Sequence, residues 1–237
     1  MKFGPWLTGR ISLETRRLMR GLAQVDRKVI KQHFEQEGLR RLHIGCGPNV
    51  LGGWLNSDLY PHRTDILHLD ATKLFPFGDR QFDYVFSEHV LEHIPVDGGM
   101  SMLRECFRVL KPGGTLRIST PDLSFLINLY PGAGQLSDLQ NSYVEWATAA
   151  TVDWPPSCRT VLAINDYFRS WGHRFIYDEG TLRAFLERAG FTDIAKCGLG
   201  ESQDEALRGL ENKQRMPEGF LSLESMILEA SKRAAPY

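Results

Sequence analysis

Four short apolar runs in the first half of the chain each end in residues that can bind a nucleoside or assist a transfer reaction. They end in Gly45-Cys46-Gly47-Pro48-Asn49, Asp58-Leu59, Asp70-Ala71 and Ser87-Glu88-His89. Paired glycines let a ligand approach main-chain N–H groups that a Cβ would shield. One carboxylate can accept both ribose hydroxyls, and another can accept an adenine amino group. A single adenosine ligand would use the first three groups, although each acid taken alone is more often a turn residue.

For these groups to meet, the runs must be neighbouring strands of one sheet. After Gly38, short β-type runs alternate with helical segments, which argues for a mainly parallel sheet with helices on its faces. In such a sheet the ligand crevice lies beyond the carboxyl ends of the strands. The predicted strands are 41–45, 54–58, 65–69, 82–87, 115–119, 191–197 and 222–228.

Apolar periodicity predicts three helices. One spans residues 12–37, and it places Leu18, Leu22, Val25 and Val29 on one face. The second ends at the Lys-Pro-Gly-Gly stop of 111–114 and has on one face Leu103, Cys106, Phe107 and Leu110. The third has Asp178 as its predicted N-cap and Gly190 as its predicted C′ residue.

The composition is that of one well-filled domain, with 237 residues of which 42% are hydrophobic. The formal net charge is -1, so no nucleic-acid partner is expected. We expect an N-terminal helical extension over 1–38. Either the helix packs on its own domain and leaves its basic face in solvent, or it contacts a partner or a membrane surface. The main domain is predicted over 39–237. We find neither a transmembrane run nor a secretory signal, and the cysteines are scattered, so we expect a cytoplasmic protein.

Sequence motifs over residues 39–122 resemble those of one enzyme family. They are LHIGCGPN (42–49), GWLNSD (53–58), LDA (69–71), FPF (75–77), EHVLEH (88–93), RVLKPGGT (108–115) and PD (121–122), and the similarity reappears over 173–191. The chain resembles the class I S-adenosylmethionine-dependent methyltransferases of the ubiquinone-biosynthesis-like group, which includes small bacterial enzymes. The resemblance implies a Rossmann-like α/β three-layer sandwich with a mostly parallel seven-stranded sheet whose last strand is antiparallel.

By the same resemblance, S-adenosylmethionine is the cofactor. The glycine loop would lie against its methionine and ribose portions, Asp58 would hold the ribose, Asp70 would meet the adenine, and Glu88 would border the sulfonium. The implied cofactor-binding residues are His43, Gly45, Cys46, Gly47, Asn49, Asp58, Leu59, Asp70, Ala71, Ser87 and Glu88. The family usually has an acidic residue where this chain has His43, which leaves open how the amino group of the methionine portion is held.

The first crossover is unusually short. Only about eight residues separate Gly45 from Trp54, whereas a parallel crossover normally takes about a dozen or more. We therefore predict that its helix is stunted or absent. The shortness also disfavours a dinucleotide, because G-x-G-x-x-G must open a helix that receives the pyrophosphate, and Val50 occupies the position of the third glycine.

The stretch His89-Val90-Leu91-Glu92-His93 allows two different chemistries. It matches the H-x-x-E-H pattern of inverted zinc peptidases, so a zinc-dependent hydrolase is an alternative function. Pro95 keeps any helix there short, and no third ligand is evident downstream, so we predict no metal site. In a methyltransferase, a histidine that accepts a proton contributes about 10² to 10⁴ in rate. The candidates, in order, are His89, His173 and His93, and each has the alternative of a purely structural histidine.

The long segment at about 122–178 is either a lid and acceptor-binding element or a small core of its own. Among its aromatic residues are Trp146, Trp154 and Trp171. Similarity to short methyltransferases of bacterial surface-glycan synthesis makes O-methylation of a small-molecule or sugar-containing acceptor, such as a lipid-linked sugar, the expected reaction. A further alternative is a non-catalytic cofactor-binding module that acts through a partner.

Overall fold

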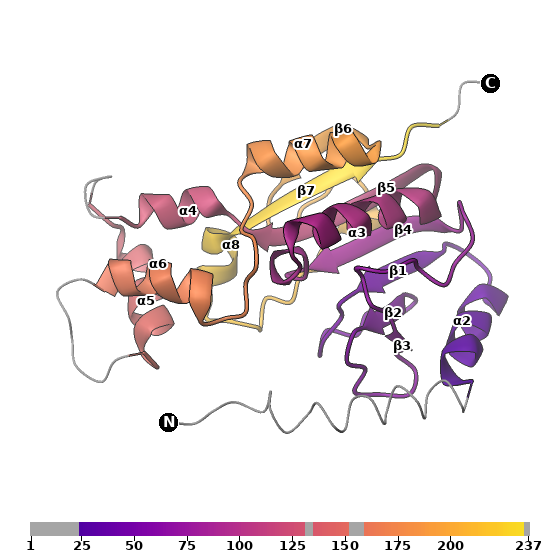
Figure 1. Cartoon of the computed structure of the whole chain (residues 1–237), viewed down its shortest axis with the longest axis horizontal. Coiled ribbons are helices and arrows are strands. Elements are labelled where there is room, and N and C mark those ends of the chain that lie inside the picture. The colour runs from indigo at the N-terminus through magenta and orange to yellow at the C-terminus, as the bar shows by residue number, and fades with distance from the viewer. Residues whose placement is uncertain (1–23, 131–134, 152–158, 235–237) are drawn as a thin grey trace.

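The computed structural model describes residues 24–130, 135–151 and 159–234. Seven strands form one sheet in the order β3-β2-β1-β4-β5-β7-β6 (Figure 1). Their bounds are β1 Arg41–Ile44, β2 Leu55–Asp58, β3 Leu67–His68, β4 Phe82–Glu88, β5 Leu110–Pro121, β6 Thr192–Cys197 and β7 Ser225–Ser231. Strand β7 runs antiparallel to β5 and β6, and the other pairings are parallel. The predicted fold class is confirmed.

Two helices, α3 (Val96–Val109) and α7 (Glu179–Ala189), pack on each other and on the main core of the sheet. The predicted ends of α7 are confirmed, because Asp178 accepts a hydrogen bond from the Thr181 N–H at 2.7 Å and Gly190 ends the helix with a φ of 109°. Only a residue without a Cβ adopts that conformation at little cost. The apolar stripes of both helices thus cover one face of the sheet.

The connection between β1 and β2 contains no helix within residues 45–54, as predicted. One buried side chain, Asn56 in β2, holds this turn instead. Its Oδ1 accepts the Leu51 N–H at 2.9 Å, and its Nδ2 donates to the carbonyls of Leu51 and Trp54 at 2.9 and 3.1 Å. Nδ1 of His43 in β1 lies 3.1 Å from the same Oδ1. These bonds satisfy the turn where a longer crossover would use helical hydrogen bonds.

The opposite face of the sheet is covered by a third layer. Within the described residues, this layer consists mainly of chain without regular secondary structure. Trp54 and Phe86 pack on that face with Leu207 and Leu210. In the segment 198–219 the regular structure is limited to the short turn η2 (Glu205–Leu207). This layer therefore comes from the first crossover and from a segment far along the chain.

A buried ion-pair cluster ties the segment 198–219 to the sheet. Arg117 in β5 is fully buried, and its Nε donates to Oε1 of Glu211 at 2.6 Å. Its Nη1 donates to Oε1 of Glu229 in β7 at 2.6 Å and to the Glu201 carbonyl at 2.8 Å. A buried guanidinium is tolerated only when it is paired and hydrogen-bonded in this way. The cluster thus fixes where the segment lies.

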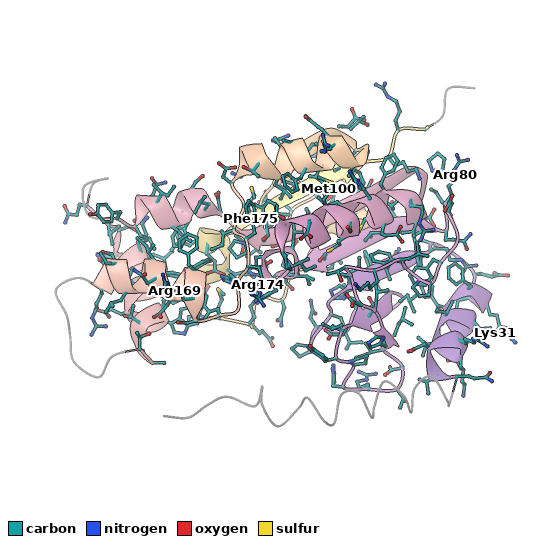
Figure 2. The ribbon with its side chains drawn as sticks, in the orientation of Figure 1. Lys31, Arg80, Met100, Arg169, Arg174 and Phe175 are labelled. Carbon is teal, nitrogen blue, oxygen red and sulfur yellow. The ribbon has the colours of Figure 1, made fainter. Side chains whose placement is uncertain are left out.

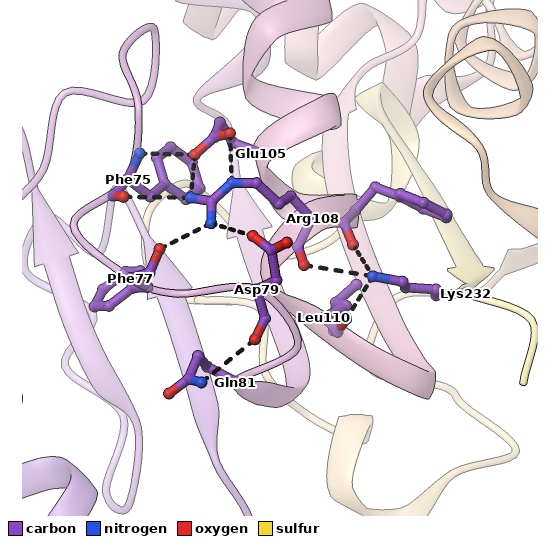
Figure 3. Close-up of polar contacts among 9 residues, drawn as sticks. Phe75, Phe77, Asp79, Gln81, Glu105, Arg108, Leu110 and Lys232 are labelled. Carbon is purple, nitrogen blue, oxygen red and sulfur yellow. Dashed lines mark hydrogen bonds and ion pairs between the residues drawn. The ribbon is translucent and has the colours of Figure 1, made fainter. Parts of the chain in front are cut away.

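Arg108, near the end of α3, fixes the connection between β3 and β4 (Figure 3). Its Nη1 donates to the Phe77 carbonyl at 2.8 Å and to Oδ1 of Asp79 at 2.9 Å. Glu105 accepts the Arg108 Nε–H at 2.8 Å and the Phe75 N–H at 2.7 Å. The arginine of the RVLKPGGT stretch therefore has a structural part, since it holds a non-helical connection against a helix.

A second, smaller core lies in a helical lobe beyond the carboxyl end of β5 (Figure 1). The lobe consists of α4 Leu123–Asn128, α5 Asp138–Thr148, α6 Arg159–Arg169 and α8 Phe220–Glu224. Its centre is polar in one place, where the hydroxyls of Tyr143 and Tyr167 both donate to Oε2 of Glu224. Of the predicted tryptophans, Trp146 is 38% exposed and Trp154 lies outside the described residues. The segment thus has both a core and exposed aromatic groups.

The first described helix, α2 (Val25–Glu35), packs beside β2 and β3 through Val29, and the ring of Phe34 meets that of Phe82 at 5.5 Å. Residues 12–23 of the predicted 12–37 helix lie outside the described residues, and the helix ends at Glu35, two residues before its predicted end. The boundary at 38 stays a prediction. Among the helices described, none combines the length and the apolar character that a membrane crossing requires.

Several predicted element ends are wrong, and two of them show the physical reason. The run 222–228 was expected to be all strand, but residues up to Glu224 belong to α8 because its side chain and those of Phe220 and Leu221 are buried by the lobe. Leu110 was assigned to the second predicted helix, yet it begins β5 opposite Phe82. In both cases tertiary burial, which periodicity does not report, decides the local structure.

Candidate active site

The ends of β1 and β2 meet directly. The loop after β1 turns through Gly45 and Gly47, with φ values of 69° and 48°. The Gly47 N–H donates to Oδ2 of Asp58 at 2.9 Å. A Cβ on Gly45 would lie 2.1 Å from Cγ2 of Val90, in the segment after β4. Three of the predicted strand ends therefore touch, and only glycine fits between them.

Asp58 and Asp70 lie at the ends of adjacent strands. The Leu69 N–H donates to the Asp58 carbonyl at 3.0 Å, which ties the end of β3 to that of β2. Oδ1 of Asp58 accepts the Tyr60 N–H at 2.7 Å, and Oδ1 of Asp70 accepts the Thr72 N–H at 3.0 Å. Both acids thus cap local turns. A carboxylate has about four acceptor sites, so Asp58, which accepts two such bonds, can also accept ribose hydroxyls.

Glu88 joins the glycine loop to the distant C-terminal segment. Its Oε1 accepts the Asn212 N–H at 3.0 Å. Nδ2 of Asn49 lies 3.5 Å from Oε2 of Glu88 and donates to the Leu210 carbonyl at 3.1 Å. Burial raises the pKa of Glu88. The part played by Asn212 was not predicted, because no local pattern signals a contact made across 124 positions of sequence.

Two buried hydroxyls at the same edge have no hydrogen-bond partner among the described residues. They belong to Ser87 in β4 and Ser119 in β5. Because buried polar groups are normally bonded, these hydroxyls suit a ligand's polar atoms. Of the other predicted residues here, Ala71 is buried and Leu59 is 38% exposed.

Two residues predicted to contact the cofactor have side chains that lie inside the protein. His43 is 1% exposed, with its ring 4.9 Å from that of Phe86. Burial lowers its pKa to about 4, so the imidazole is neutral near pH 7. Cys46 is 3% exposed, and burial raises its pKa to about 12. Both side chains are buried, and their part in cofactor binding stays a prediction.

His89 follows the sheet with a φ of 50°, which is uncommon for a residue with a Cβ. Its Nδ1 lies 3.0 Å from Oε1 of Glu92, and its Nε2 lies 2.9 Å from the Ser225 hydroxyl. Thr120 donates to Oε2 of Glu92 at 3.1 Å. Although burial raises the pKa of Glu92, the imidazoles of His89 and His93 lower it to about 2. Glu92 is therefore an ionised, fully buried carboxylate.

The H-x-x-E-H stretch does not form the helix of an inverted zinc peptidase. Its one helical turn, η1, spans only Leu91–His93, and His89 precedes it. A different histidine completes a cluster, because ligand atoms of Glu92, His93 and His173 all lie within 4.8 Å of one another. The expectation that no third ligand lies downstream is therefore corrected. The fold returns His173 to this point, 80 residues along the chain.

An apolar pocket of about 390 Å³ lies between α4 and α6 of the lobe. Its lining consists of Leu123, Leu126, Ile127, Tyr130, Ile164 and Phe168. Helix α4 begins directly after β5, so the pocket lies on the side of the sheet where the strands end. All six lie in the segment at about 122–178, which was predicted to be either a lid and acceptor-binding element or a small core.

Comparison with known proteins agrees with this arrangement. A family profile described as a methyltransferase domain matches residues 53–118. A demethylmenaquinone methyltransferase of Staphylococcus epidermidis is 30% identical over 140 residues, which cover 54% of this chain and 48% of the relative. One from Listeria welshimeri is 46% identical over 55 residues, 23% of this chain and 22% of the relative. The chain thus spans about half the length of the Staphylococcus relative and a smaller part of the Listeria relative.

Among solved structures, a SAM-dependent methyltransferase from Archaeoglobus fulgidus is similar over 89% of this chain and 94% of its own, with 17% identity and a TM-score of 0.49. Residues 53–118 match a methyltransferase domain, and the strand order, the glycine loop and the acids at the strand ends are those expected of the class I S-adenosylmethionine-dependent methyltransferases. The cofactor of that class is S-adenosylmethionine.

The burial of neutral His43 predicts how stability depends on pH. Its folded pKa of about 4 lies below the usual 6.5, so the unfolded chain takes up this proton first as the pH falls. The free energy of unfolding should drop by about 3 kcal/mol between pH 6.5 and 4 on account of this residue. Urea titrations across that range measure the drop.

His33 and His173, whose pKa values burial also lowers, add to the drop in the same direction. In His43→Gln, the free energy of unfolding should therefore fall less steeply with decreasing pH. The matched control is His62→Gln, which removes an exposed histidine and should leave that slope unchanged. Equal slopes in the two variants would show that His43 is not held neutral.

Proposed function

We propose that the chain transfers a methyl group from S-adenosylmethionine to an oxygen of a small-molecule acceptor. The observation that carries the proposal is the 2.9 Å hydrogen bond from the Gly47 N–H to Asp58, which unites the glycine loop and the proposed ribose-binding acid at one point. The zinc-hydrolase alternative receives less support, because it needs both histidines of H-x-x-E-H on one helix and His89 precedes η1. The alternative of a non-catalytic module rests on a basic helix whose residues 12–23 lie outside the described residues.

The residues at the strand ends fit the proposed cofactor. Asp58, Asp70 and Glu88 supply carboxylates, and Ser87 supplies an unpartnered hydroxyl, at an edge that would receive a cationic nucleoside. Carboxylates suit ribose hydroxyls, an adenine amino group and positive charge, and they disfavour a pyrophosphate. When bound, S-adenosylmethionine supplies a methyl group that its sulfonium charge has already activated. The protein's part is to align the acceptor and exclude water.

An oxygen acceptor has a proton to lose, and His89 is the proposed base. The ionised carboxylate of Glu92 faces Nδ1, which favours the tautomer with its proton there and a lone pair on Nε2. The His89 side chain is only 4% exposed, and its Nε2 contacts the half-buried Ser225 hydroxyl. We therefore propose that the acceptor proton reaches His89 through Ser225. His173 and His93 are the next candidates.

The lobe pocket favours an acceptor with an apolar portion, because six apolar side chains line it. A lipid-linked sugar and a prenylated ring compound both meet this requirement, and the names of the curated relatives point to the second. The described cysteines Cys46, Cys106 and Cys197 are free thiols, which fits the proposed cytoplasmic location.

Replacing Asp58 tests the cofactor site. In Asp58→Asn the shape is kept while the charge and one acceptor are lost, so the affinity for S-adenosylhomocysteine should fall by about 1 to 3 kcal/mol. Isothermal titration of the full chain measures it, with NADH expected not to bind. Asp65→Asn, in an exposed pair with Arg63, is the matched control and should bind normally. Unchanged affinity in Asp58→Asn would remove Asp58 from the site.

Replacing His89 and Ser225 tests the proton path. With an acceptor found from a panel of labelled methyl-transfer assays, His89→Gln should lower kcat by about 10² or more. Ser225→Ala should lower kcat with little change in KM, and the double variant should be no slower than His89→Gln, since the two act in series. Ser222→Ala, an exposed serine three residues away, should keep full activity. Independent, multiplying losses would contradict a shared path.

Replacing Ile127 tests the acceptor pocket. This residue lines the pocket and is 61% exposed, so Ile127→Ser should fold normally. Its KM should rise severalfold for an acceptor with an apolar tail and stay unchanged for the same head group without the tail. Leu74→Ser, at an exposed position outside the lobe, is the control. An equal KM change for both acceptors would argue against this pocket.

A further inference from the structure

Three potential metal ligands come together where the segment after β4 meets the chain that leaves α6. Oxygen and nitrogen atoms of Glu92, His93 and His173 lie within 4.8 Å of one another, and the two imidazole rings are 5.0 Å apart. Backbone hydrogen bonds hold the two segments together, since the Glu92 carbonyl accepts the N–H groups of Arg174 and Phe175 at 2.6 and 3.2 Å. Figure 2 shows Arg174 and Phe175 between the sheet and the helical lobe.

Glu92 offers a buried oxygen, Oε1, that accepts no well-aligned hydrogen bond. Thr120 bonds Oε2, but Oε1 has no hydrogen bond among the described residues, although the side chain is fully buried. His89 approaches Oε1 at 3.0 Å and His93 at 3.9 Å, close enough for ion pairs but without hydrogen-bond alignment. Buried anionic oxygens are usually paired, hydrogen-bonded or bound to a metal ion.

His173 is arranged as a ligand. Its Nδ1 lies 2.6 Å from the Tyr167 carbonyl, which can only accept, so this nitrogen carries the proton and Nε2 carries a lone pair. Metal-binding histidines characteristically donate their second ring nitrogen to a backbone carbonyl in this manner.

We propose that Glu92, His93 and His173 bind a divalent transition-metal ion, for which Zn²⁺ is the best match. Two imidazoles and one carboxylate form a ligand set that suits Zn²⁺ and leaves a further position open. The His93 side chain is 41% exposed, so the ion can enter from solvent on its side. Tetrahedral ligands that bind an ion at about 2.1 Å lie about 3.4 Å from one another, which is closer than the present limit of 4.8 Å. The exposed side chain of His93 can move inward to close this difference.

The proposed ligand set differs from the H-x-x-E-H motif. The motif would use the imidazoles of His89 and His93, whereas the proposed site uses those of His93 and His173. His89 instead faces Ser225 through Nε2, where it serves the proposed proton path. A metal ion here is therefore compatible with methyl transfer and does not depend on it. The competing interpretation is a purely structural cluster, in which His93 and His173 only pack against each other and against the ring of Tyr167.

Metal binding by the full-length chain tests the proposal. The protein is stripped with chelator and titrated with Zn²⁺ by calorimetry, and its metal content is measured after dialysis. We expect one equivalent of Zn²⁺, with the Kd raised at least about tenfold in His93→Gln and in His173→Gln. His62→Gln, an exposed histidine elsewhere, should bind as the unaltered chain does. Circular dichroism and binding of S-adenosylhomocysteine confirm that each variant is folded.

A second measurement excludes the free cysteines as ligands. Co²⁺ in place of Zn²⁺ should give visible d–d bands without the strong near-ultraviolet absorption of a thiolate complex, and the bands should be lost in His173→Gln. The proposal is overturned if the chain binds no Zn²⁺, if His93→Gln and His173→Gln bind as tightly as His62→Gln, or if the Co²⁺ spectrum shows thiolate. Each of these outcomes leaves the test of Asp58 unaffected.

Discussion

The shortness of the connection between β1 and β2 is the constraint on which the rest of this structure depends. A parallel crossover of this length has no room for a helix, so Asn56 and neutral His43 must satisfy and pack the turn. The turn then places the Gly47 N–H against Asp58. A longer, helical crossover would cover the same face of the sheet with an apolar stripe and would need neither residue.

Because that helix is missing, the second face of the sheet needs another cover. The segment 198–219 provides it, anchored through Glu211 to the buried guanidinium of Arg117. The next residue, Asn212, donates its N–H to Glu88 at the end of β4. One irregular segment therefore stabilises the sheet and shapes the edge at which the cofactor is proposed to bind. Its charges are buried, so loss of one partner would leave another unpaired.

Glu92 has a comparable structural part near the ends of β4 and β5. Its carboxylate contacts Thr120 at the end of β5 and His89 at the end of β4, and its carbonyl holds the chain that leads out of the lobe. A buried ionised group with contacts to three segments sets their relative positions closely, because each contact that is lost leaves charge unsatisfied in a medium of low polarity. This explains how a lobe with its own core is held at a fixed place relative to the strand ends.

The amino-acid sequence by itself determined the carboxyl ends of the first four strands to within one residue, the missing first helix, the caps of α7 and the class of cofactor. These features depend on residue type at short spacing: glycine where φ is positive, Asp as an N-cap, and carboxylates directly after apolar runs. Tertiary structure alone decided that His43 and Cys46 are buried, that Leu110 begins a strand, that Asn212 meets Glu88, and that His173 joins Glu92 and His93. Those outcomes depend on contacts between residues far apart in the chain, and neither periodicity nor motif spacing carries information about them.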